Sequence, residues 1–79
     1  MDIDQLKAAI RTVNDFPIPG IAYRDITSLT ENPQAFNHTL MMLASGIEAF
    51  GGDKIIGIES RGFVFGAPLS DRLRLPFIM

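Results

Sequence analysis

The sequence has no cysteine and a single histidine, and these two shortages exclude whole classes of site. Without cysteine there is neither a disulfide framework nor a thiolate metal site, and one histidine cannot build a multi-histidine centre. Basic residues are also few, because seven Lys and Arg stand against nine Asp and Glu, for a net charge of −2. We therefore expect no metal held by protein ligands and no nucleic-acid partner, while a local anion site stays possible.

Long apolar runs are missing as well. No stretch approaches the roughly 18 residues that a membrane span needs. The opening MDIDQLKAAI carries two aspartates where a secretory signal would carry basic residues. We therefore expect a cytoplasmic protein without a membrane partner. Hydrophobic residues nevertheless make up 47% of the sequence, which excludes intrinsic disorder. The length of 79 residues predicts at most one small domain.

The periodicity of the first residues predicts a helix over residues 2–13. Its apolar positions are spaced three, four and three apart, and they are Ile3, Leu6, Ile10 and Val13. Asp2 is a suitable cap for this helix. The helix should stop before NDFPIPG, because prolines and Gly20 do not continue it.

An extended run, residues 21–23, follows and leads into Arg24 and Asp25. Neighbours in an extended segment face opposite ways, so we expect each of these two side chains to bond elsewhere rather than to the other.

Residues 33–50 carry the clearest helical pattern. Asn32 is a good cap, Pro33 suits the first helical position, and Gly51 with Gly52 ends the helix. Apolar residues spaced four, three, four and three apart predict one buried face, made of Phe36, Leu40, Leu43, Ile47 and Phe50. His38 lies on the opposite stripe and is expected to face solvent.

The remaining residues predict a strand–helix–strand unit. Residues 54–58 have the length and apolar character of a strand, and residues 63–73 predict a helix that is buried on most faces. Pro68 either kinks that helix or marks its first turn. The final LPFIM predicts a second strand, parallel to the first with a right-handed crossover. Ligands of such sheets bind at the carboxyl ends of the strands.

The turn between the predicted strand and helix, Glu59-Ser60-Arg61-Gly62, is the first candidate site. Unpaired N–H groups at a helix start, with the Arg61 guanidinium, suit an anion. An ordinary turn capped by Ser60, with Arg61 in solvent, is the alternative, and because the pattern is short, spacing alone favours that ordinary turn.

The second candidate is FPIPGIAYRDIT. Tyr23 offers an aromatic face to a planar ligand, and extended backbone offers groups that read a heterocycle's edge. From the residues alone, a rigid surface loop with Tyr23 packed on the core is favoured over this interpretation.

Together, FPIPGIAYRDITSLTENPQAF and KIIGIESRGFVFGAPLSDRL resemble the adenine phosphoribosyltransferases. The resemblance covers essentially the whole chain but only the amino-terminal part of the family's pattern. It implies an α/β phosphoribosyltransferase-type fold with a parallel βαβ unit, preceded by two helices and a short base-binding hood segment. It also implies a single incomplete domain over residues 1–79. Residues 1–31 would form the adenine side, and residues 32–79 a helix plus the start of the core.

The family transfers the 5-phosphoribosyl group of phosphoribosyl pyrophosphate to adenine, giving AMP and pyrophosphate, in purine salvage. By resemblance, Ala22, Tyr23 and Arg24 bind adenine, with Tyr23 stacking on the base. By the same resemblance, residues 59–62 (Glu59, Ser60, Arg61 and Gly62) bind pyrophosphate, and the Glu59–Ser60 peptide bond is cis. Mg²⁺ would arrive with phosphoribosyl pyrophosphate rather than on protein ligands, and the full-length form would be a homodimer.

Two family segments, the phosphoribosyl-binding loop and the mobile loop with its acidic catalytic residue, have no counterpart here. We therefore expect a fragment without a catalytic residue that is inactive by itself. The abrupt hydrophobic end, LRLPFIM, agrees with that expectation. Two alternatives stay open, namely a purine- or phosphoribosyl-sensing binding module of the same fold and a non-functional truncated product.

Overall fold

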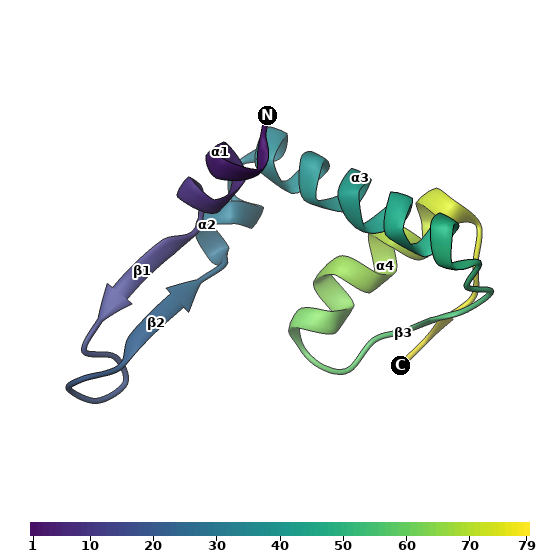
Figure 1. Cartoon of the computed structure of the whole chain (residues 1–79). Coiled ribbons are helices and arrows are strands. Elements are labelled where there is room, and N and C mark those ends of the chain that lie inside the picture. Colours follow the sequence, from purple (N-terminus) through teal and green to yellow (C-terminus); the bar gives the residue numbers. More distant parts are fainter. The chain divides into compact units, whose positions relative to one another are not determined.

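The computed structural model describes all 79 residues and divides them into two compact units, Met1–Thr39 and Leu40–Met79. The elements in chain order are α1 (Ile3–Ala8), β1 (Arg11–Asn14), β2 (Ala22–Asp25), α2 (Thr27–Thr30), α3 (Pro33–Phe50), β3 (Ile55–Ile56), α4 (Arg61–Leu73) and β4 (Phe77–Ile78) (Figure 1). Helices and strands thus share the chain, as expected for an α/β protein.

The first unit is built around an antiparallel hairpin of β1 and β2, in which Val13 pairs with Tyr23. Helix α1 precedes it and begins with a reciprocal cap. The Asp2 carboxylate accepts from the Gln5 N–H at 2.8 Å, and the Gln5 side chain accepts from the Asp2 N–H at 2.9 Å. The predicted Asp2 cap is therefore confirmed.

The helix predicted over residues 2–13 is wrong in its second half. Helix α1 ends at Ala8, and the chain then turns into β1. Thr12 and Val13 are β-branched and favour a strand, and pairing with β2 supplies backbone partners that an isolated helix pattern does not reveal. The four-residue helix α2 was not predicted.

Helix α3 confirms the predicted bounds. The Asn32 side chain accepts from the Ala35 N–H at 3.1 Å, and Gly51 adopts a φ of 82° just past the helix end. The predicted buried face is only partly right, because Leu40 is buried while Leu43 is 42% and Phe50 89% exposed. No other helix or strand of the chain covers the carboxyl-terminal end of this apolar face of α3. His38 is half-buried rather than solvent-facing.

The second unit contains the predicted strand–helix–strand arrangement, with β3 parallel to β4 and Ile55 paired with Phe77. Strand β3 is two residues long, shorter than the predicted run 54–58. Helix α4 starts at Arg61, two residues before the predicted start at residue 63, so Pro68 lies inside the helix and not in its first turn.

The prediction that the helix over residues 63–73, which corresponds to α4, is buried on most faces is wrong. Only Gly66 and Leu69 are buried, and Val64 is 43% exposed. Helix α4 packs against β3 and β4, and a two-stranded sheet can cover only one side of a helix.

Candidate functional site

The three residues predicted to bind adenine occupy consecutive positions on β2. Ala22 pairs with Asn14 and Arg24 with Thr12, while Tyr23 pairs with a valine of β1. Side chains alternate along a strand, so the Tyr23 ring lies on one face of the hairpin, and Ala22 and Arg24 lie on the other. The backbone groups of Ala22 and Arg24 share one direction, since the two residues are two positions apart.

Tyr23 lies at an apolar hollow on its face of the hairpin. The ring is half-buried and meets Phe16 edge-on, with centroids 5.3 Å apart and planes at 66°. The hollow has a volume of about 280 Å³ and is lined by Val13, Phe16, Tyr23, Asp25 and Thr27. The ring thus packs on a neighbour and also forms a wall of a cavity, and the role of Tyr23 in binding a planar ligand stays a prediction.

An ion pair beside this hollow holds the two strands together. The Arg11 guanidinium on β1 donates to the Asp25 carboxylate on β2 at 2.6 Å and 2.9 Å. The backbone N–H and hydroxyl of Thr27 donate to the same carboxylate at 3.0 Å and 2.8 Å. These Thr27 donors, with Arg11, lower the pKa of Asp25 to about 2.

The prediction that Arg24 and Asp25 bond elsewhere is confirmed, because Arg24 donates to the Thr12 hydroxyl. Sequence reasoning did not find Arg11 or Thr27 as partners. The opposite charges of Arg11 and Asp25 were visible, but only the strand register brings them together.

The loop that joins the strands is closed by its own side chains and backbone. Gly20 has a φ of 91°, in the region that glycine favours, and its N–H donates to the Asp15 carboxylate at 2.9 Å. The Phe16 N–H donates to the Ile21 carbonyl at 3.2 Å. The Phe16–Pro17 peptide bond is cis. This loop therefore delivers the chain into β2 at Ala22 along a defined path.

The residues predicted to bind pyrophosphate lie where the turn after β3 meets α4: Glu59 and Ser60 end the turn, and Arg61 and Gly62 are the first two residues of the helix. The Gly62 N–H donates to the Ile58 carbonyl at 3.0 Å, and the Phe63 N–H donates to the Ser60 carbonyl at 3.1 Å. These two N–H groups are therefore already hydrogen-bonded to carbonyl groups of the same segment. Ser60 precedes the helix, but its hydroxyl makes no capping hydrogen bond. The predicted cis Glu59–Ser60 bond is confirmed.

Three glycines let the turn and helix α4 lie close to the sheet. A Cβ on Gly62 would come within 3.3 Å of the Gly57 backbone, and a Cβ on Gly57 within 2.6 Å of the Phe77 ring. The same ring lies 2.5 Å from a Cβ built on Gly66. Phe77 of β4 therefore fills the space that missing side chains leave on β3 and α4, and it meets Phe63 edge-on at 6.1 Å. This packing fixes where the turn begins.

The two candidate segments lie in different units of the chain, residues 22–24 in the first and residues 59–62 in the second. No group of three or more His, Cys, Asp or Glu side chains is placed to hold a metal ion. None of the helices combines the length and apolar character that crossing a bilayer requires.

No family model matches the chain. Curated relatives named adenine phosphoribosyltransferase do match it. The Campylobacter curvus protein is 53% identical over 95% of this chain and 41% of its own length. The Campylobacter concisus protein is 57% identical over 89% of this chain and 38% of its own length.

Solved structures of adenine phosphoribosyltransferases match the fold as well. The Thermoanaerobacter pseudethanolicus enzyme has a TM-score of 0.82 and 40% identity over 96% of this chain and 45% of its own. The Saccharomyces cerevisiae enzyme, solved with adenine and an imino-altritol bisphosphate, has a TM-score of 0.84 and 35% identity over 94% of this chain and 44% of its own. Over nearly all of its residues, then, this chain is a homologue of the adenine phosphoribosyltransferases, and it spans about two fifths of the length of the curated relatives it matches.

Proposed function

We propose that this chain carries the adenine-binding and pyrophosphate-binding segments of an adenine phosphoribosyltransferase that acts in purine salvage. The observation that carries the proposal is the match to enzymes of that name across 95% of the chain, since such a match spans both candidate segments. One of the matching structures was solved with adenine. The reaction moves the phosphoribosyl group of phosphoribosyl pyrophosphate to adenine.

The adenine side is assigned to the β1–β2 hairpin. Tyr23 would stack on the base, because its ring already forms one wall of an apolar hollow. The parallel backbone directions of Ala22 and Arg24 would present an N–H and a carbonyl to the base edge, which displays both acceptors and donors. The ion pair of Arg11 and Asp25 would keep this edge in register.

The pyrophosphate side is assigned to residues 59–62, at the junction of the turn and helix α4. Arg61 stands at the amino-terminal end of α4, where the helix dipole favours an anion and a guanidinium can grip two oxygens. Its role would be to stabilise the charge that develops on the departing pyrophosphate. Mg²⁺ belongs to the phosphoribosyl pyrophosphate substrate in this proposal.

No residue of the chain is assigned a catalytic role, and we expect the 79 residues alone to form no AMP. A homodimeric full-length form is a further part of the proposal that rests on the resemblance, and a cytoplasmic location stays a prediction from the sequence.

Adenine binding can be tested with the chain's own fluorescence. The sequence has one tyrosine and no tryptophan, so intrinsic emission reports on Tyr23 alone. Stacked adenine should quench that emission saturably, whereas cytosine should not. By calorimetry, Tyr23→Ala should weaken adenine binding about tenfold to hundredfold, and Tyr23→Phe should retain it. Equal affinity of Tyr23→Ala and the parent chain would refute the assignment.

Pyrophosphate binding needs a separate titration with Mg²⁺–pyrophosphate. Arg61→Ala should weaken binding about tenfold or more. Arg72→Ala is the matched control, because it removes the same side chain from the last turn of the same helix. Equal losses in the two variants would show a general charge effect and would remove Arg61 from the site.

A further inference from the structure

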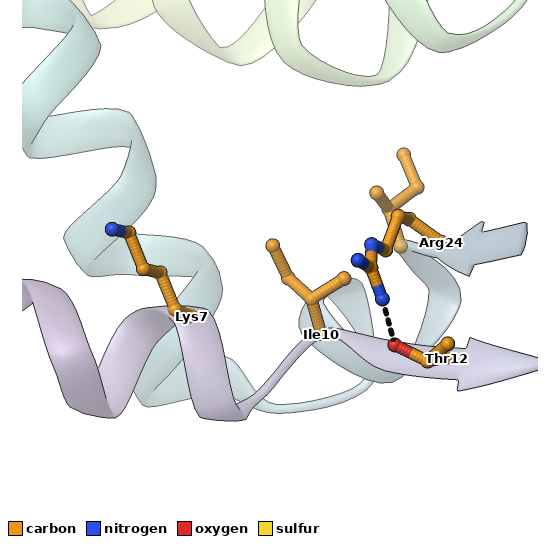
Figure 2. A pocket seen from close by; sticks show the side chains of 5 residues that line it. Lys7, Ile10, Thr12 and Arg24 are labelled. Carbon is orange, nitrogen blue, oxygen red and sulfur yellow. Dashed lines mark hydrogen bonds between the residues drawn. The ribbon is translucent and has the colours of Figure 1, made fainter. Parts of the chain in front are cut away.

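A second cavity lies on the face of the hairpin opposite the Tyr23 ring. Its volume is about 370 Å³, and it is lined by Lys7, Ile10, Thr12, Arg24 and Ile26. Figure 2 shows Ile10 between Lys7 and Arg24, with the Arg24 guanidinium turned toward Thr12. Helix α1, strand β1 and strand β2 each contribute to the lining. The cavity is of the size that a small organic ligand fills rather than a bare ion.

The polar side chains that line this cavity can all donate hydrogen bonds, and none of them carries a negative charge. Lys7 makes no side-chain hydrogen bond or ion pair. Arg24 donates one of its guanidinium N–H groups to the Thr12 hydroxyl at 2.5 Å, drawn as the dashed line in Figure 2. Because that hydroxyl oxygen accepts from Arg24, its own hydrogen is left to donate.

No carboxylate balances these two cations. None lines the cavity. The carboxylate of Asp25, next to Arg24 in sequence, lines the hollow on the other face and accepts from Arg11 and Thr27. The cavity therefore holds two positive charges and a hydroxyl donor beside a wall of isoleucine side chains.

We propose that this cavity binds a phosphate monoester, with the phosphate at Arg24 and Thr12, Lys7 adding a second positive charge to the lining, and the organic part against Ile10 and Ile26. A phosphate monoester carries a charge of about −1.5 to −2 at neutral pH, which matches two cations better than a carboxylate does. The Arg24 fork suits two phosphate oxygens, and Thr12 can donate to a third. The site uses the Arg24 side chain, whereas adenine binding uses its backbone, so this inference does not depend on the proposed function.

The probe is phenyl phosphate, titrated into the full chain with its isoleucine methyl groups labelled for NMR. We expect saturable shifts at Ile10 and Ile26. Ile58 is the internal control, because it directly precedes the turn 59–62 and reports on phosphate bound there. Benzoate should bind more weakly, and benzyl alcohol should not bind. Shifts confined to Ile58, or equal shifts with benzyl alcohol, would overturn the proposal.

Variants that each neutralise one cation distinguish binding in this cavity from a general attraction of the phosphate to positive charge. Lys7→Gln should weaken phenyl phosphate binding about fivefold and Arg24→Gln about tenfold. Lys54→Gln is the matched control, since it removes an exposed cation from the other unit. Thr12→Val keeps the charge and should also weaken binding. If the Lys7→Gln and Thr12→Val variants both bind phenyl phosphate as the parent does, then Arg24 and Thr12 only brace the hairpin and the ligand does not bind in this cavity.

Discussion

The same substitution at two glycines should affect stability differently, stabilising the protein at one position and being neutral to destabilising at the other. Gly46 lies inside α3 and Gly66 inside α4, both in the second unit and both at ordinary helical φ. A Cβ on Gly46 would meet nothing within 4 Å, whereas a Cβ on Gly66 would lie 2.5 Å from the Phe77 ring. The pair therefore isolates the cost of moving that ring.

The magnitudes follow from two terms. Replacing an interior helical glycine by alanine stabilises a helix by about 1 kcal/mol, so Gly46→Ala should raise the free energy of unfolding by about that amount. Gly66→Ala gains the same term but must displace Phe77, which costs about 1–3 kcal/mol for an overpacked site. Part of that cost is the lost edge contact with Phe63, about 0.5–1.5 kcal/mol. Gly66→Ala should therefore be neutral to about 2 kcal/mol destabilising.

The assay is urea unfolding followed by circular dichroism, run at two protein concentrations to detect association. Repeating both substitutions in a Phe77→Leu background is the decisive control, because leucine lacks the ring atoms nearest to Gly66. There, Gly66→Ala should become stabilising by nearly as much as Gly46→Ala. If Gly66→Ala stabilises the parent chain as much as Gly46→Ala does, the close packing of Phe77 against α4 is refuted.

Three further predictions concern single local features. Hydrogen bonds depress the pKa of Asp25 to about 2, so its contribution to stability is full above about pH 4 and is lost as pH falls toward 2. Asp25→Asn should flatten the stability profile in that window, and an unchanged acid limb would contradict this assignment. Asn32→Ala removes the side-chain acceptor of the Ala35 N–H and should cost about 1 kcal/mol in urea unfolding. An unaltered midpoint would show that the cap contributes nothing. Arg74 ends α4 with a φ of 58°, so Arg74→Gly should raise the free energy of unfolding by about 0.5–1 kcal/mol, and a lowered free energy of unfolding would count against strain there.

The sequence predicts best where the signals are local. Both ends of α3 follow from Asn32, Pro33 and Gly51, which act within one helical turn. The predicted carboxyl-terminal end of the first helix is wrong for the opposite reason. Its apolar spacing continues to Val13, but pairing of Val13 with Tyr23, ten residues away, outweighs the helical pattern. Exposure of Phe50 was equally unpredictable, because periodicity shows that a face is apolar and not whether anything covers it.

The candidate site divides along the same line. Its segments are predicted from motif and resemblance, and the cis bond at Glu59–Ser60, expected on the same basis, is confirmed. The supporting contacts were not found. The pairing of Arg11 with Asp25 depends on strand register, and the nesting of Phe77 against Gly57 depends on the third dimension. Neither leaves a periodic trace in the sequence.

The supporting contacts of each candidate segment come from within its own unit. Cross-strand bonds from Arg11 hold the hairpin that presents Tyr23, and they involve no residue beyond α2. The turn at Arg61 is fixed by Gly57, Gly62 and Phe77, which all belong to the second unit. Because the two sets share no side chain, their energetic effects should add rather than couple. Each candidate segment therefore owes its local geometry to contacts within its own unit.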